Sequence, residues 1–163
     1  MRWGVFVRRA HRNVGECSHA LNAKGFTLGG ISANDSGSSG VLISGDVDGK
    51  FEKPKYLGKS DTSVEAVVRG TDSSVYAIGS STELLAGKKL AGLRDGVIAK
   101  YSSTGKLSAL VRSSAAKAKR EWTSATSALF LAGSVQSGQK FESAVTKFAT
   151  NLSPTWTYRF AST

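Results

Sequence analysis

The segment SSVYAIGSS at 73–81 has two near copies in this chain, KGFTLGGIS at 24–32 and SALFLAGSV at 127–135. In each copy an apolar run of β-prone residues leads to a glycine, and the three copies align on that glycine. Four or five such residues bounded by Ser and Gly predict a strand that is buried on both faces. The aligned glycines are Gly30, Gly79 and Gly133.

Each copy is followed by a second group of similar segments. These are SGVLISGDVDGKFEKPKYLG at 39–58, DGVIAKYSSTGKLSALVRSS at 95–114 and ESAVTKFATNLSPTWTYRFA at 142–161. In the middle segment, strand-like runs at 97–101 and 107–112 flank a four-residue turn that ends at Gly105, which predicts a β-hairpin. Self-similarity at a spacing of roughly 50 residues indicates a repeat, copied because one unit cannot bury its own apolar face.

The other two repeats contain matching turns, at 45–49 and at 149–152. In the last turn we expect Asn151 to take the left-handed conformation that glycine takes elsewhere. One further strand is predicted upstream of each first segment, so each repeat offers four strands. The predicted upstream strands are 17–21, 64–69 and 122–125. The sequence therefore predicts an all-β protein of three four-stranded antiparallel repeats.

Composition agrees with a single domain rich in strands and turns. The chain has 163 residues, 40% of them apolar, with 18 glycines and only 2 prolines. No run approaches the roughly 18 apolar residues of a membrane span. Cys17 is the only cysteine, which rules out an intrachain disulfide. We interpret it as a small apolar residue, since His11 and His19 nearby are weak evidence for a nucleophile and supply no complete zinc site, and we expect no cofactor.

A net charge of +10 raises the question of a nucleic-acid partner. The lysines and arginines are spread over all three repeats, and no aromatic residues are interleaved with them as a stacking surface requires. A generally basic surface, suited to solubility or to weak contact with polyanions, is the preferred interpretation.

The middle repeat has a VYxxG strand followed by a strand that begins with aspartate and ends in lysine and tyrosine. This pattern is carried by Val75, Tyr76, Gly79, Asp95, Val97, Lys100, Tyr101 and Gly105, and in the third repeat by Gly133, Glu142, Val145, Lys147, Phe148 and Trp156. It resembles the bacterial β-propeller repeat family (SBBP-like repeats) over most of 24–163. The first repeat departs from the pattern, because Ser39, Ser44 and Gly45 replace the acidic, lysine and aromatic positions.

The resemblance implies a blade-like fold, with repeats at approximately 17–58, 64–114 and 121–163. Propellers close with 4 to 8 blades, so three repeats imply a fragment of a longer propeller, an open stack, or copies of the chain that complete a ring. Residues 1–23 are expected to be the end of a preceding blade or partly ordered, since 3–8 read like the last strand of the third repeat. A β-sandwich is the alternative fold. The resemblance also implies a secreted or cell-surface protein, although no signal peptide opens the chain, which leaves the cytoplasm open.

The segment 82–94 distinguishes the middle repeat from the others. It forms a connection of thirteen residues, whereas the equivalent connections at 33–38 and 136–141 have six. An insertion in one repeat often marks a binding surface. We therefore single out Lys88, Lys89 and Arg94 as candidate partner contacts, while the alternative is that the leucines of this segment cap the sheet.

The sequence gives no catalytic pattern. Asp46 and Asp48 suggest a calcium loop, but the closing ligands are lacking, and we interpret the segment as a hairpin turn. The sequence thus favours a non-enzymatic binding or scaffold module with an unidentified protein or polysaccharide partner. The alternatives are a fragment of a propeller hydrolase or lyase, and a basic polyanion-binding protein.

Overall fold

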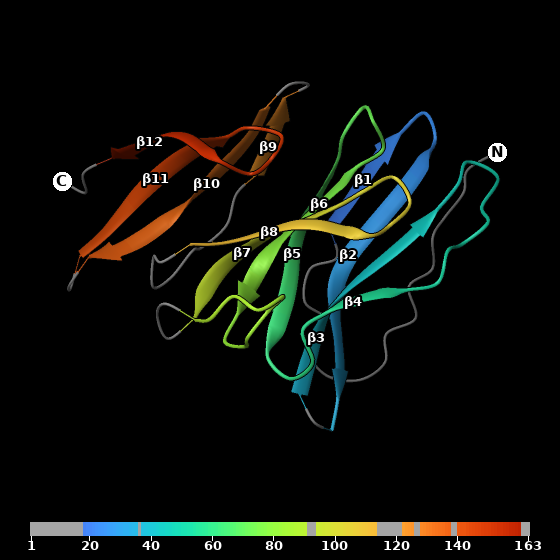
Figure 1. The fold of residues 1–163 in the computed structure, drawn as a ribbon, viewed down its shortest axis with the longest axis horizontal. Helices are drawn as coiled ribbons and strands as arrows, with labels where there is room; N and C mark the ends of the chain where they lie inside the picture. The colour runs from blue at the N-terminus through green and yellow to red at the C-terminus, as the bar shows by residue number, and fades with distance from the viewer. Residues whose placement is uncertain are drawn as a thin grey trace.

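The computed structural model describes residues 18–35, 37–90, 94–113, 122–125, 128–137 and 140–160. These residues form twelve strands in three four-stranded antiparallel sheets (Figure 1). The all-β prediction is confirmed. Within the described ranges, no helix has the length and apolar character needed to cross a membrane.

Each sheet is a meander of consecutive strands. The first contains β1 (Ser18–Asn22), β2 (Gly25–Asn34), β3 (Gly37–Gly45) and β4 (Lys55–Leu57). The second contains β5 (Thr62–Arg69), β6 (Val75–Ser81), β7 (Asp95–Tyr101) and β8 (Leu107–Ser113). The third contains β9 (Trp122–Ala125), β10 (Ala128–Ser137), β11 (Lys140–Phe148) and β12 (Pro154–Phe160).

The aligned glycines occupy the same place in all three sheets. Each lies in the second strand and faces an aligned residue of the third strand. The pairs are Gly30 with Val41, Gly79 with Val97, and Gly133 with Ala144. The repeat alignment made from the sequence therefore describes equivalent positions in space.

The connections in the first and third sheets are shorter than predicted. β2 and β3 stay paired up to Asn34 and Gly37, and β10 and β11 stay paired up to Ser137 and Lys140. The predicted six-residue loops are therefore wrong, since most of those residues continue the strands. In the middle sheet the strands separate after Ser81, and the inserted segment begins there.

The three β-hairpin turns after the third strands share one geometry. In each, the first residue donates its N–H to the carbonyl of the fifth, and the fourth residue has a positive φ: +82° at Gly49, +77° at Gly105 and +66° at Leu152. The prediction that Asn151 takes this conformation is wrong. Asn151 instead accepts a hydrogen bond from the Ser153 N–H at 2.9 Å, as an Asx turn does.

The Asp46 turn is built in the same way. Asp46 Oδ1 accepts hydrogen bonds from the backbone N–H groups of Asp48 at 3.1 Å and Lys50 at 2.9 Å. This confirms a hairpin turn at the segment that resembles a calcium loop.

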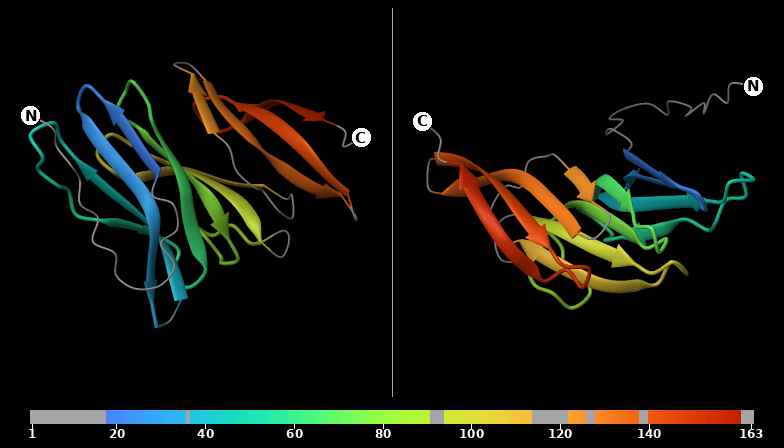
Figure 2. Two further views of the ribbon diagram at one scale, coloured as in Figure 1. Left: turned by 180° about the vertical axis from the view of Figure 1, so that it is seen from behind. Right: turned by 90° about the horizontal axis from the view of Figure 1, so that it is seen from above.

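The sheets stack through two apolar clusters, with the β5–β8 sheet in the middle (Figure 2). One cluster joins Leu42 and Leu57 of the first sheet to Val64 and Val97 of the second. The other joins Ile78 and other residues of the second sheet to residues of the third. Every residue of β6 is buried, as the sequence predicts for a strand covered on both faces.

Some predictions lie outside the described residues. These concern the strand at 3–8, and Cys17 with His11. His19 lies in β1 and is exposed.

Candidate functional site: the connection between β6 and β7

The connection from Thr82 to Arg94 places the candidate partner contacts in two different settings. Lys88 and Lys89 are adjacent and exposed. Arg94 is half-exposed and forms an ion pair with Asp61, so its charge is already balanced. The three candidates therefore do not form one cationic cluster: two lysines face solvent, and the arginine belongs to a polar network behind them.

A tight turn presents the two lysines. Leu85 and Lys88 exchange backbone hydrogen bonds of 2.8 and 3.3 Å, and Ala86 and Gly87 between them have φ values of +46° and +75°. Positive φ at both central residues is the geometry of a type I′ turn. The chain thus reverses sharply at this point, which exposes Lys88 on the outer side.

The leucines of this segment divide between core and surface. Leu85 is buried in the cluster between the first two sheets, which fulfils the capping role considered for it. Leu84 is exposed, and Leu90 is partly buried. Leu93 lies outside the described residues. One leucine therefore anchors the connection while another adds an apolar contact to the exposed surface.

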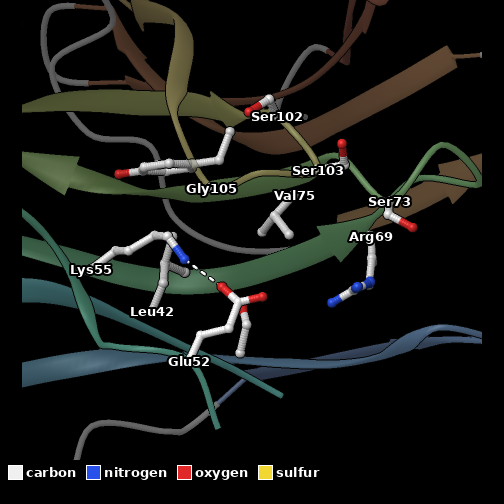
Figure 3. A pocket seen from close by; sticks show the side chains of 11 residues that line it. Leu42, Glu52, Lys55, Arg69, Ser73, Val75, Ser102, Ser103 and Gly105 are labelled. Atoms are coloured by element: carbon white, nitrogen blue, oxygen red, sulfur yellow. Dashed lines mark hydrogen bonds and ion pairs between the residues drawn. The ribbon is translucent and has the colours of Figure 1, made fainter. Parts of the chain in front are cut away.

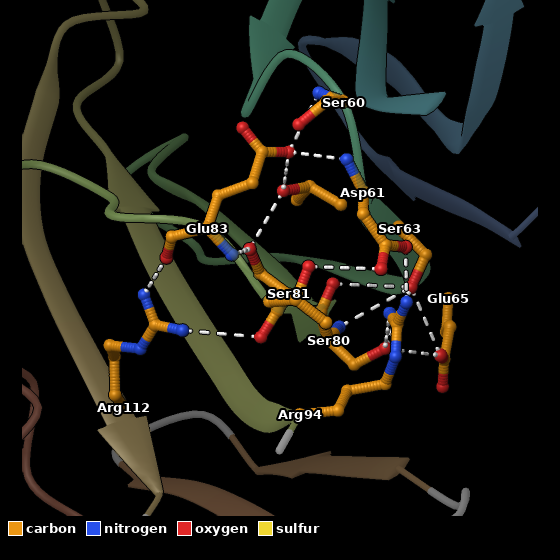
Figure 4. A network of polar contacts seen from close by, with 11 residues as sticks. Ser60, Asp61, Ser63, Glu65, Ser80, Ser81, Glu83, Arg94 and Arg112 are labelled. Carbon is orange, nitrogen blue, oxygen red and sulfur yellow. Dashed lines mark hydrogen bonds and ion pairs between the residues drawn. The ribbon is translucent and has the colours of Figure 1, made fainter. Parts of the chain in front are cut away.

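Glu83 fixes the start of the connection to the chain before β5 (Figure 4). Its carboxylate accepts the backbone N–H groups of Lys59 at 2.7 Å, Ser60 at 2.8 Å and Asp61 at 2.6 Å, and the hydroxyl of Thr62 at 2.9 Å. Burial alone raises the pKa of Glu83, but these hydrogen bonds outweigh it, so the pKa lies below the ordinary glutamate value. The ionised side chain of Glu83 therefore joins the connection between β6 and β7 to the chain before β5 by hydrogen bonds.

Arg112 holds the connection from the other side. Its guanidinium donates to the carbonyl oxygens of Ser81 at 3.1 Å, Lys88 at 3.2 Å and Glu83, and its Nε donates to Asp95 Oδ2 at 2.9 Å. Arg112 lies in β8, the last strand of its sheet. In the structure its side chain is buried, because the inserted connection folds over the end of β8.

Arg94 links the end of the connection to β5 and β6. Besides the Asp61 carboxylate, it contacts the Ser80 hydroxyl at 3.1 Å. Ser80 also donates to Glu65 at 3.3 Å, and Ser63 donates to the same carboxylate at 3.1 Å. The hydrogen bond from Arg94 keeps the pKa of Asp61 below its usual value. The polar side chains behind Lys88 and Lys89 thus form hydrogen bonds and an ion pair with one another.

A small cleft lies at the opposite end of β7, between the first two sheets (Figure 3). Lys55 pairs with Glu52 at 2.6 Å at its edge and packs over Gly105. Arg69 donates to the carbonyl of Phe26 and the hydroxyl of Thr27, both at 3.2 Å. Burial raises the pKa of Tyr101, which also lines the cleft. Lys55 and Glu52 therefore pair with each other at this space, whereas the buried Nε of Arg69 has no hydrogen-bond partner among the described residues.

The sequence did not reveal the residues that fix the connection. Glu83, Asp61 and Arg112 come from segments that only the fold brings together. A signal was nevertheless present for one pair: Asp95 and Arg112 align with Glu142 and Arg159 of the third repeat, and both pairs are ion pairs in the structure. Opposite charges at two aligned positions of two repeats predict contact between them.

No family model and no curated protein matches this sequence. Among solved structures, the chain is similar to one described as "Crystal structure of the eukaryotic initiation factor", with a TM-score of 0.48 and 15% identity over 95% of this chain and 35% of that one. The chain thus spans about a third of that protein's length. A similarity of this extent identifies neither a family nor a function.

Proposed function

We propose that this protein is a non-enzymatic binding or scaffold module, built of three blade-like sheets of a partial β-propeller, that binds its partner through the connection between β6 and β7. The observation that supports this proposal is the contrast within that connection. Glu83, Leu85 and Arg112 hold its backbone in place, while the side chains of Leu84, Lys88 and Lys89 are exposed.

A surface held in this way loses little conformational freedom when it binds a partner, which improves affinity. Loops placed on a rigid scaffold are also the usual location of binding residues. Two lysines beside an exposed leucine suit a partner with acidic groups next to an apolar surface, such as a protein or an acidic polysaccharide.

The test is quantitative capture of partners from an extract of the source organism with the wild-type protein and with the double variant Lys88→Ala/Lys89→Ala. The matched control is Lys24→Ala/Lys106→Ala, which removes two exposed lysines elsewhere. We expect the first variant to lose a partner that the control retains. Equal retention by all three proteins would refute the assignment of this surface.

The net charge of +10 favours a polyanion as a second candidate partner. Retention on heparin distinguishes the two proposals. A general polyanion binder elutes at a similarly reduced salt concentration for both double variants, because its affinity depends on total charge. A specific surface at the connection makes the Lys88/Lys89 variant elute earlier than the control.

A further inference from the structure

The three sheets pack on one another in a constant order. Each sheet has two faces, which we call leading and trailing. In the β5–β8 sheet the leading face carries Val75 and Val97, and the trailing face carries Tyr76 and Ile98. In the other two sheets each face is the one that carries the residues aligned with these. The leading face of the β5–β8 sheet packs on the trailing face of the β1–β4 sheet, where Leu42 aligns with Ile98. The leading face of the β9–β12 sheet packs on the trailing face of the β5–β8 sheet. Aligned faces therefore meet in both contacts. The first contact is the closer one, since β5 lies against β1, β2 and β3, whereas among the described residues no strand of the β9–β12 sheet comes as close to the β5–β8 sheet.

In the described part of the chain, two faces have no sheet packed against them (Figure 2). One is the leading face of the β1–β4 sheet. Phe26 on this face aligns with Val75 and Leu129, both of which are buried in sheet contacts. Phe51 packs edge-on against Phe26 with ring centroids 5.4 Å apart and is 63% exposed. The leading face of the β1–β4 sheet thus carries an apolar side chain at a position whose counterparts in the other two sheets are buried.

The other is the trailing face of the β9–β12 sheet. Phe130 aligns with Tyr76, which is buried in the second contact, and its ring lies 6.0 Å from that of Trp156. Tyr158 is 60% exposed and packs against Phe160 at 4.9 Å. Four aromatic residues thus lie on the trailing face of the β9–β12 sheet, whereas the trailing faces of the other two sheets are each covered by the next sheet.

The contact between the second and third sheets contains a specific polar interaction. Lys100 lies over the ring of Tyr76, 5.4 Å from its centroid, and donates to the carbonyl of Thr150 in the turn of the next sheet at 2.8 Å. The third sheet repeats the contact between lysine and ring: Lys147 lies over the ring of Phe130, 5.9 Å from its centroid.

The matching turn is present in the first sheet. Val47 is the residue aligned with Thr150, and it lies between Asp46 and Asp48 in a turn of the same geometry. A β1–β4 sheet placed on the trailing face of a β9–β12 sheet would bring this acidic turn to Lys147. The charge of Lys147 is complementary to that of this turn, which favours this partner surface and this register over others.

We infer that a second copy of this chain occupies these faces: the leading face of the β1–β4 sheet of one copy packs on the trailing face of the β9–β12 sheet of another. The interface is head to tail, so it joins two different surfaces and leaves one of each at the ends. Such an interface produces a closed ring or an open chain of copies. The inference does not depend on the proposed role of Lys88 and Lys89.

The first experiment measures mass in solution against concentration, by sedimentation velocity and light scattering. The wild type should exceed its monomer mass of 17.1 kDa as concentration rises. Phe51→Glu blocks one face and Tyr158→Glu blocks the other, and each should raise the dissociation constant at least tenfold. Thr71→Glu, which adds the same charge to an exposed turn, is the matched control and should associate like the wild type. Circular dichroism establishes that each variant is folded.

Mixing the two blocked variants tests the head-to-tail geometry. Each retains one intact face, so an equimolar mixture should form a complex of two chains and nothing larger. A wild type that stays at 17.1 kDa at every concentration would overturn the inference. It would also be overturned if Phe51→Glu alone dimerised with the dissociation constant of the wild type, since the leading face of the β1–β4 sheet would then take no part in the contact.

A charge exchange gives an independent check. Lys147→Glu and Asp48→Lys should each weaken association at least tenfold, and the chain that carries both substitutions should recover at least half of the loss in log units. Losses that simply add in the double variant would contradict the placement of Lys147 against the Asp46–Asp48 turn, and with it the inferred alignment of the faces.

Discussion

Arg112 donates a hydrogen bond from Nε to Asp95 Oδ2 at 2.9 Å, and the two side chains are 5% and 0% exposed. The aligned residues Arg159 and Glu142 form the same pair at 3.5 Å, with side chains 57% and 29% exposed. The repeat therefore contains one ion pair in two environments. The insertion between β6 and β7 causes the difference, since it covers the pair in the middle sheet and has no counterpart in the third.

This comparison predicts unequal effects of the same substitution. Arg112→Met leaves the Asp95 carboxylate buried and removes three hydrogen bonds to carbonyl groups, so it should lower the free energy of unfolding by about 3–5 kcal/mol. Arg159→Met should lower it by less than about 1 kcal/mol, because water screens an exposed pair. Urea denaturation followed by circular dichroism measures both. Similar losses for the two variants would contradict the role assigned to the insertion.

A second prediction concerns the aligned glycines. A Cβ at Gly79 would lie 1.9 Å from the Ser63 carbonyl oxygen of β5, next to the irregularity after Val64, whereas a Cβ at Gly30 would meet nothing within 4 Å. Gly79→Ala should therefore force strand β5 to move and destabilise the protein by about 3 kcal/mol or more. Gly30→Ala should be neutral or slightly stabilising, because alanine loses less backbone entropy on folding than glycine. Thermal unfolding of the two variants decides the point, and a Gly79→Ala protein as stable as the wild type would contradict it.

A third prediction concerns the left-handed residue of the last turn. Leu152 has a φ of +66° and is buried between the second and third sheets. Leu152→Gly relieves a strain of about 1–2 kcal/mol but removes a buried side chain worth about 2–5 kcal/mol, so the variant should be less stable. Ser73→Gly is the comparison. Ser73 has a φ of +63° and a small side chain, so this variant should gain stability. Melting temperatures that move in the same direction for both would contradict the balance described here.

A fourth prediction concerns pH. Because the pKa of Glu83 is lowered in the folded state, its stabilising contribution is present above its unfolded pKa of about 4.3 and is lost as pH falls through the lower folded value. The melting temperature of Glu83→Gln should therefore lie below that of the wild type at pH 6, and the difference should shrink below pH ~4. Glu52→Gln, at an exposed pair, should change the melting temperature little. A difference for Glu83→Gln that stays constant down to pH ~2 would show that the carboxylate charge does not fix the connection.

Local pattern was sufficient for the strands but not for their ends. The apolar run at 73–81 predicts a buried strand, and β6 is buried throughout. The connections of the first and third sheets were predicted too long, because Ser, Gly and Asn residues near 33–38 are typical of loops. Pairing between β2 and β3 holds Asn34, Gly37 and Ser38 in strands nonetheless. Tertiary pairing overrides weak local preference at such positions.

At the candidate surface, too, the sequence predicts one part of the result and the fold decides the other. The length and composition of 82–94 mark it as an insertion with lysines and leucines, and the sequence singles out Lys88, Lys89 and Arg94 without separating them. Only the fold places Asp61 beside Arg94 and leaves the two lysines exposed. No local pattern contains this information, because the partner of Arg94 lies 33 residues away in the chain.

The sequence by itself determined the repeat, its strands and the equivalence of positions such as Gly30 and Gly79, because alternation of apolar residues and turn-forming glycines are local properties of the chain. The tertiary structure decided which of the equivalent positions are covered. A residue and its counterpart, such as Arg112 and Arg159, hold equivalent positions within their own sheets. Their burial differs because it depends on which other part of the chain covers each sheet.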